Sequence, residues 1–177
     1  ITSMKITLLF IVVTLSICFQ SFSQSREAGT DLAAIKDYMR SKDSIPVSPK
    51  NKDIAAIKSI LRQYNSALEK LDITGTDAFF TDESEIFESG RNEGSYSNYM
   101  HNHLMSELKE FKSLKHDEYE LKVTLAGNYA FATETYTSNI VVLKDNTKVK
   151  RREVSTSVLK KRKGQWKIIT KHNSSRK

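Results

Sequence analysis

Residues 119–130 read YELKVTLAGNYA, and this stretch decides the fold. Apolar and polar residues alternate up to Leu125, which predicts a strand with one buried face. Gly127 and Asn128 then favour a tight turn. The next stretch, residues 129–143, is rich in Thr, Tyr and Val and contains no proline, so it predicts a second strand. The two strands should pair as an antiparallel hairpin.

Two further strands follow this hairpin along the chain. We predict one over residues 147–162 and a closing one from Trp166 to about Ser174, with turns at 144–146 and 163–165. Four consecutive strands joined by short turns imply an antiparallel meander. Strict alternation in the closing strand places five side chains on one face, toward the core or a pocket: Trp166, Ile168, Thr170, His172 and Ser174.

Helical periodicity dominates the chain before the strands. An apolar stripe spaced by three and four residues predicts a helix over 53–72, with Asn51 or Asp53 as its cap. A second helix is predicted over 95–111, with the stripe Tyr96, Met100, Leu104, Leu108 and Phe111. Between them, residues 84–88 suggest a short strand and residues 89–94 a turn. Helices that precede a meander must cover one of its faces, so we expect an α+β domain.

The N-terminal residues have the pattern of a secretion signal. Met4 fits a true start, with residues 1–3 read through from upstream, and Lys5 precedes an apolar run that ends at Phe19. Small residues then favour cleavage after Ser23. An uncleaved anchor is the alternative, although the run is short for a membrane span of about 20 residues. We therefore predict an exported protein, periplasmic or extracellular, without a membrane span once mature.

Cys18 is the only cysteine and lies inside this apolar run. Cleavage would remove it, and disulfides, thiolate metal sites and cysteine nucleophiles would then be excluded. A lipid anchor on Cys18 is a weaker alternative, because the preceding Ile17 is not small. We expect a linker with a short helix over residues 24–52 and the folded domain over 53–175.

Charge is unevenly distributed along the sequence. Residues 144–177 hold thirteen Lys or Arg and two acids, whereas acids outnumber bases by 19 to 14 in residues 24–143. A basic tail can indicate nucleic-acid binding. Export argues against nucleic acid as the partner, so we expect solvated strand faces or attraction between the oppositely charged ends of two subunits.

Several pieces of the sequence together resemble a known family. They are Tyr64–Leu68, Gly90–Gly94, Tyr99–Leu108, Ala126–Ala130 and Val158–Ser174. In this order and spacing they resemble the SnoaL-like, ketosteroid-isomerase-like branch of the nuclear-transport-factor-2-like superfamily, over roughly residues 53–175. The resemblance implies a curved antiparallel sheet wrapped around the N-terminal helices, shaped like a cone with a pocket. That fold serves isomerases, dehydratases and non-catalytic binders, so it does not imply one activity.

Histidines are the first candidate site residues. His101 and His103 lie two apart on a predicted helix and therefore point in different directions, so they cannot share one ion. His103 should face inward. We hypothesise that His103 and His172 approach each other in the pocket, where they would hold an anionic ligand or, together with a carboxylate, bind a metal ion. The favoured alternative is a pair of hydrogen-bonded pocket histidines without a metal. Tyr99 and Trp166 complete the predicted ligand-binding set.

Acid–base chemistry of the isomerase type needs a carboxylate and a proton donor in an apolar pocket. Glu134 is the candidate base, and Tyr64 or Tyr136 the candidate donor. Ala130 and Ala132 share a strand face with Glu134 and would leave room for a ligand. No phosphate-cradling loop or dinucleotide motif is present, so we expect no cofactor.

Three functions remain open at this point. The favoured one is a non-catalytic domain that binds a small apolar or anionic molecule and forms a homodimer. The second is an acid–base enzyme, an isomerase or dehydratase, acting on a small hydrophobic substrate. The third is a dimeric interaction module. A buried carboxylate with a raised pKa would favour the enzyme, and a pocket filled by its own side chains would favour the interaction module.

Overall fold

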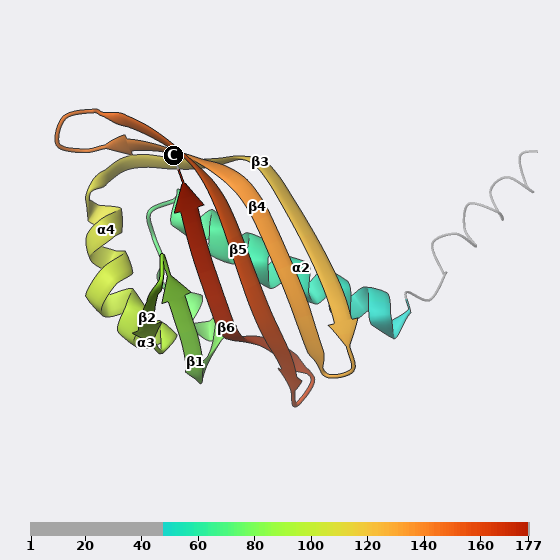
Figure 1. The fold of residues 1–177 in the computed structure, drawn as a ribbon. Helices are drawn as coiled ribbons and strands as arrows, with labels where there is room; N and C mark the ends of the chain where they lie inside the picture. Colours follow the sequence, from blue (N-terminus) through green and yellow to red (C-terminus); the bar gives the residue numbers. More distant parts are fainter. Residues whose placement is uncertain (1–47, 177) are drawn as a thin grey trace, which may run out of the picture. The chain divides into compact units, whose positions relative to one another are not determined.

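A curved sheet with helices on one of its faces makes up the part of the chain that the computed structural model describes, residues 48–176 (Figure 1). The predicted signal peptide and nearly all of the predicted linker over residues 24–52 lie outside these residues. The helical elements are α2 (Pro49–Glu69), η1 (Thr76–Phe79), α3 (Tyr96–Tyr99), η2 (Met100–Leu104) and α4 (Met105–Lys109). The strands are β1 (Phe80–Glu88), β2 (Arg91–Gly94), β3 (Phe111–Ala126), β4 (Tyr129–Val142), β5 (Lys148–Arg162) and β6 (Gln165–Arg176).

The predicted meander is confirmed. The six-stranded sheet has the order β2-β1-β6-β5-β4-β3, and every neighbouring pair is antiparallel except β1 and β6. Residues 89–94, predicted as a turn, form a hairpin instead. Ser89 and Gly90 both have positive φ, of 48° and 87°, which is the geometry of a two-residue hairpin turn, and Arg91 then starts β2. The α+β class with a curved sheet is therefore correct.

Helix α2 begins earlier than its apolar stripe indicates. Ser48 is the cap, and its Oγ accepts a hydrogen bond of 3.3 Å from the backbone N–H of Asn51. Pro49 occupies the first helical position, where its fixed φ suits the helix and its missing N–H leaves no bond unmade. The predicted caps Asn51 and Asp53 are thus wrong.

The second helical segment contains a π-helical turn. Residues 96–109 are helical throughout, but Met100–Leu104 are wound more loosely than an α-helix. The loose turn shifts the buried stripe by one residue. Tyr99 is therefore buried, and Met100, which the regular period placed in the stripe, is only partly buried.

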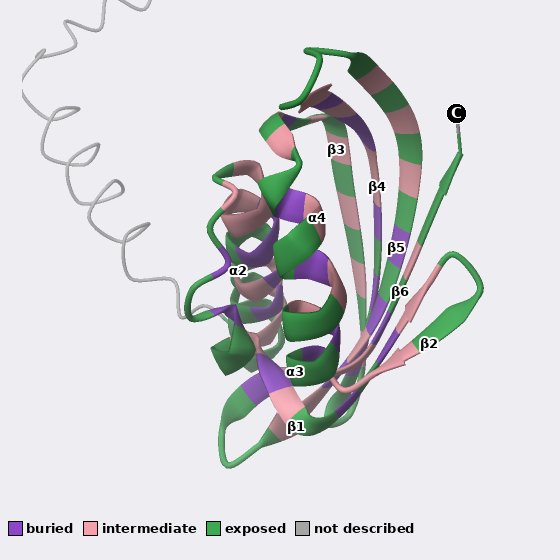
Figure 2. Cartoon of the chain, turned by 90° about the vertical axis from the view of Figure 1, so that its left-hand side faces the viewer, coloured by how far each residue is buried: buried purple, intermediate pink, exposed green. Residues whose placement is uncertain are grey.

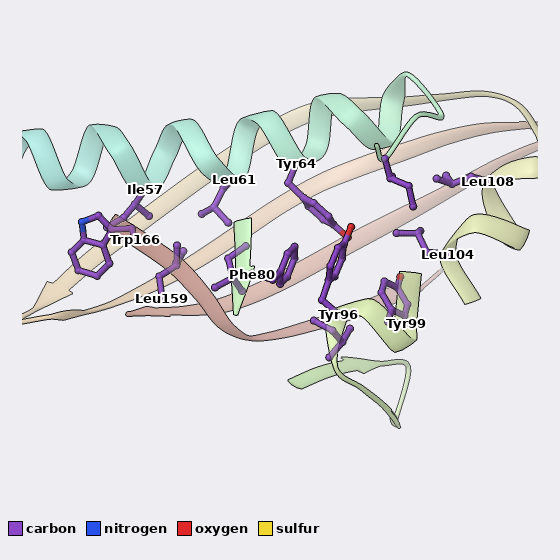
Figure 3. Close-up of a cluster of buried hydrophobic side chains, with 14 of the residues drawn as sticks. Ile57, Leu61, Tyr64, Phe80, Tyr96, Tyr99, Leu104, Leu108, Leu159 and Trp166 are labelled. Carbon is purple, nitrogen blue, oxygen red and sulfur yellow. The ribbon is translucent and has the colours of Figure 1, made fainter. Parts of the chain in front are cut away.

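The apolar core lies between α2 and one end of the inner sheet face (Figures 2 and 3). Ile57 and Leu61 of α2 are fully buried with Leu159 and Ile168 of the sheet. An aromatic cluster continues this core. The rings of Phe80 and Tyr96 stack at 3.7 Å, and Tyr64 meets both edge-on.

A β-bulge changes which residues of β6 face the helices. Ile168 pairs with Leu159 and Thr170 pairs with Val158, so Ile169 is an extra residue without a partner. The extra residue reverses the alternation beyond it. Lys171 is consequently buried, and His172 is exposed. Trp166 and Ile168 face inward as predicted, but the predictions for Thr170, His172 and Ser174, which lie beyond the extra residue, are wrong.

Within residues 48–176, no helix covers the outer sheet face (Figure 2). Apolar side chains are exposed on this face. Phe131 is 51% exposed and Val154 is 44% exposed. The homodimer expected from the sequence stays a prediction. Within residues 48–176, no helix is both long and apolar enough to cross a membrane.

Candidate functional site

A small cavity of about 80 Å³ lies inside the fold, between the helices and the inner face of the sheet. Its wall combines aromatic, apolar and charged side chains from α2, β1, the second helical segment and the last four strands. The charged and polar members are Glu88, Glu107, His116, Ser138, Arg151, Glu153, Lys171, Asn173 and Ser175, and the tyrosines are Tyr64, Tyr99 and Tyr136.

Strand register brings polar residues into one row across the inner face. Glu88 of β1 pairs with Asn173 of β6, Asn173 pairs with Ser155 of β5, and Ser155 pairs with Glu134 of β4. Toward the other end of the sheet, the same strands carry the apolar residues Ile168, Leu159 and Ala130. The inner face is therefore divided into an apolar end and a polar end. The cavity lies at the polar end.

Glu134 is the hub of a buried hydrogen-bond network. Its Oε1 accepts hydrogen bonds from Asn65 Nδ2 at 2.5 Å and from the Tyr119 hydroxyl at 2.7 Å. Its Oε2 accepts one from Lys171 Nζ at 3.0 Å. The Glu134 side chain is fully buried and that of Lys171 is 2% exposed, so the two charges form an ion pair without water.

Lys171 connects this network to the cavity. Besides Glu134, its ammonium donates to Ser155 Oγ at 2.6 Å and lies 5.3 Å from the centre of the Tyr64 ring. The full set of partners explains how a lysine is tolerated at this depth, because a buried charge is stable only when it is paired and hydrogen-bonded. Lys171 also lines the cavity, whereas Glu134 does not.

The prediction that Glu134 is a free base is therefore corrected. A general base needs an accessible lone pair facing the substrate, and both Glu134 oxygens are already occupied by donors. The geometry makes Glu134 the counter-ion of Lys171. Ala130 and Ala132, which were expected to leave room beside it, are buried in the core.

The tyrosine predictions agree with the geometry. Tyr64, Tyr99 and Tyr136 all line the cavity. Burial raises the pKa of each hydroxyl above its ordinary value, with neighbouring tyrosines and carboxylates adding to the effect. All three hydroxyls therefore stay protonated at neutral pH and are available as hydrogen-bond donors. Their roles in proton donation and ligand binding stay predictions.

The predicted histidine pair is not formed. His103 does turn toward the sheet, but its ring lies against Glu93, at 3.4 Å, and Glu88, at 3.9 Å, beside a surface groove next to β2. His172 is exposed beyond the β6 bulge, so the two histidines cannot share a ligand in the cavity. Within residues 48–176, no three His, Cys, Asp or Glu side chains are arranged to hold a metal ion.

Trp166 has a structural position instead of the predicted ligand-binding one. Its indole Nε1 donates to Asp53 Oδ1 at 3.0 Å, and Lys161 donates to the same oxygen. These contacts tie the first turns of α2 to the hairpin between β5 and β6. Trp166 is buried and does not line the cavity.

Sequence reasoning missed several titratable residues of the cavity wall, among them His116, Glu107 and Glu153. Burial lowers the pKa of His116, which therefore stays neutral, and its ring contacts Tyr136 at 4.4 Å between centres. Burial raises the pKa of Glu107, with the nearby Glu88 adding to it, and burial also raises the pKa of Glu153. The alternation of apolar and polar residues predicted that Tyr119 faces inward. The same alternation did not identify His116, because a bulge lies between the two residues.

Comparison with known proteins supports the fold. A family model described as a SnoaL-like domain matches residues 57–176. Among functionally curated proteins, none matches this chain in sequence. Many solved structures share the fold, and three of them represent its range.

The first is a type 2 hexachlorocyclohexane dehydrochlorinase (LinA), with a TM-score of 0.65 and 13% identity over 72% of this chain and 88% of that chain. The second is a nuclear-transport-factor-2-like protein from Salmonella enterica serovar Typhimurium, with a TM-score of 0.60 and 20% identity over 68% and 89%. The third, provisionally assigned as a ketosteroid isomerase, is from Shewanella frigidimarina, with a TM-score of 0.56 and 24% identity over 66% and 92%. Such identities establish a common fold and no common activity.

Removing the buried ammonium should destabilise the fold. Lys171→Met leaves the Glu134 carboxylate buried without its partner, so the free energy of unfolding should fall by about 3–5 kcal/mol. Urea unfolding followed by circular dichroism measures it. Adding Glu134→Gln should recover part of the loss, because the pair acts as a unit. Lys148→Met, at an exposed position, is the control and should change stability by less than about 0.5 kcal/mol. A small loss in Lys171→Met would contradict the network.

The neutral state of His116 should make stability depend on pH. The unfolded chain regains the ordinary pKa of 6.5, whereas burial lowers the folded pKa. The unfolded state therefore binds more protons as the pH falls below about 6.5, and stability is lost in that range. His116→Gln should lack this loss, so its unfolding curve should change less between pH 8 and pH 5.5 than that of the original chain. Equal changes would show that His116 is not protected from protonation.

Proposed function

Because this chain belongs to the SnoaL-like domain family, we propose that it is a small-molecule-binding domain whose ligand occupies the interior cavity. One observation carries the proposal. At the polar end of the sheet, a cavity is lined by side chains from α2, from the second helical segment and from five strands. Protein interiors are close-packed, and a void among polar groups is normally occupied.

The size of the cavity limits the ligand. Pockets for drug-sized molecules measure roughly 300–1,000 Å³, whereas this cavity measures about 80 Å³. A ligand of only a few non-hydrogen atoms fits that space. The cavity also argues against a purely structural interaction module, whose interior would be filled by its own side chains.

The hydrogen bonds of Glu134, the base expected from the sequence, favour binding without catalysis. Glu134 already accepts three hydrogen bonds, so it is not available to take a proton from a substrate. Lys171, held by Glu134 and Ser155, is a fixed ammonium at the cavity wall. A fixed, charged wall recognises a ligand through complementary groups and needs no proton transfer.

We also propose that the protein is exported and forms a homodimer. The positively charged Lys5, the apolar run that follows it and the small residues before position 24 support export. The exposed Phe131 and Val154 on the helix-free sheet face support self-association, because apolar residues on a face without cover favour burial against a second copy.

Native mass spectrometry of the protein purified from its own host tests these points together. We expect a chain that starts at Gln24, a dimer mass, and a small additional mass that dissociates on collisional heating. Ser138→Leu should abolish that additional mass, because the larger side chain fills the cavity from the buried inner face of β4.

Thr133→Leu is the matched control for this substitution. It makes the same kind of change on the same strand, at an exposed position. The control should keep the small bound mass, and circular dichroism should show both variants folded. An original chain without any bound molecule, and without binding to a fragment library by ligand-observed NMR, would contradict the proposed function.

A second candidate function is acid–base catalysis on a small substrate. The observation that favours it is the raised pKa of Glu107 and of Glu153 beside a neutral His116 in one cavity wall. Paired groups whose environments hold one as an acid and one as a base are typical of active sites. Such a wall could protonate a substrate oxygen and remove a proton from the neighbouring carbon.

Proton exchange in heavy water tests this candidate. Dihydroxyacetone is small enough for the cavity, and catalysis would accelerate exchange of its carbon-bound protons, measured by NMR. Glu107→Gln should then lower the exchange rate by about 100-fold or more. Glu110→Gln, exposed at the end of the same helical segment, is the control and should leave the rate unchanged. Exchange no faster than in buffer would exclude this activity for that substrate class.

A further inference from the structure

Buried polar side-chain atoms without a hydrogen-bond partner gather around the cavity. Within residues 48–176 there are four of them: Glu88 Oε2, Glu93 Oε1, His116 Nδ1 and Asn173 Oδ1. The two carboxylate oxygens lie 3.9 Å and 3.4 Å from the His103 ring nitrogens, as ion-pair contacts without a hydrogen bond. His116 Nδ1 is an acceptor in the neutral tautomer that carries its proton on Nε2. Three of these four belong to residues that line the cavity, namely Glu88, His116 and Asn173. Buried polar atoms are rarely left unpaired, because a group that has lost its water without gaining a partner destabilises the fold.

These acceptors come from different parts of the sheet and converge on the same space. Glu88 and Asn173 are direct neighbours across β1 and β6. His116 lies on β3, at the opposite edge of the sheet, and the curvature of the sheet brings it to the same cavity. A ligand in this space would therefore meet acceptors on opposite sides. It must offer more than one donor to satisfy them.

The charges around the cavity favour the same kind of ligand. Three carboxylates line it, from Glu88, Glu107 and Glu153, and the cations are Arg151 and Lys171. Lys171 is already neutralised by Glu134. Arg151 then faces three carboxylates, of which Glu88 also lies 3.9 Å from the His103 ring. Mutual repulsion contributes to the raised pKa of Glu107, after burial, and a positive charge in the cavity would relieve it.

We infer that the ligand is a small organic cation with several hydrogen-bond donors, of the class of a hydroxylated primary ammonium. This inference rests on the proposed binding function and names its ligand class. An anion would lie among three carboxylates, and an apolar molecule would leave the acceptors of Glu88, His116 and Asn173 unpaired. The tyrosine rings that line the cavity add a favourable surface for a cation.

Three probes of nearly equal size separate charge from shape. They are ethanolammonium, ethylene glycol and glycolate, which are positive, neutral and negative. Titrations followed by ¹H–¹⁵N NMR should show ethanolammonium binding at least ten times more tightly than ethylene glycol, with glycolate weakest. The side-chain amide signals of Asn173 should shift during the ethanolammonium titration, because its carbonyl oxygen gains a donor.

Glu88→Gln tests the carboxylate directly. This variant keeps the shape of the side chain but removes its charge, so ethanolammonium should bind at least ten times more weakly. Glu85→Gln makes the same change on β1 at an exposed position and should bind like the original chain. The NMR spectrum of each variant reports whether it is folded. If Glu88→Gln is unfolded, Asn173→Leu, which removes a neutral acceptor, should show the same loss.

Two results would overturn the inference. Ethylene glycol or glycolate binding as tightly as ethanolammonium would show that the cavity does not select a cation. An anionic or apolar molecule retained in native mass spectrometry, with no ethanolammonium binding, would overturn the ligand class and leave the binding function intact. If no molecule is retained and none of the three probes binds, both the ligand class and the binding function fail.

Discussion

The buried ion pair between Glu134 and Lys171 is the interaction on which the rest of this interior depends. Through it, Asn65 of α2 and Tyr119 of β3 meet the same carboxylate as Lys171 of β6, and Ser155 of β5 accepts from the same ammonium. One network therefore joins the long helix to four strands. A buried pair gains little stability over an apolar replacement, but a network with fixed partners disfavours other arrangements of the same elements.

The pair also marks where the apolar interior ends. On its one side, Ile168 and Leu159 pack against α2 as a closed core. On the other side, the inner face becomes polar and the cavity begins. A polar inner face cannot be covered by packing alone, because each group needs a partner. Part of that requirement is met within the fold, whereas Glu88 Oε2, His116 Nδ1 and Asn173 Oδ1 have no hydrogen-bond partner among residues 48–176.

Much of the architecture could be predicted from local patterns, and the site could not. Alternation identified the strands, and the stripe through Ile57, Leu61 and Tyr64 identified α2, because both patterns reflect burial on one face. Alternation placed Glu134 on one strand face with Ala130 and Ala132 but left open whether that face meets the core or water. The partner of Glu134 was not recognised, since counting by two along the last strand selects His172. The bulge at Ile169 shifts the alternation by one residue, so Lys171 is buried in place of His172.

The sequence by itself determined the α+β class, the order of helices and strands, and most of the side chains that face inward. These follow from interactions between residues close in the chain, which leave a periodic pattern. Only the tertiary structure decided that Glu134 is a counter-ion, that Lys171 reaches the cavity, and that His116 and Glu88 line the same cavity. Those facts depend on strand register and on bulges, which are set by contacts between residues far apart in the sequence and leave no local period to read.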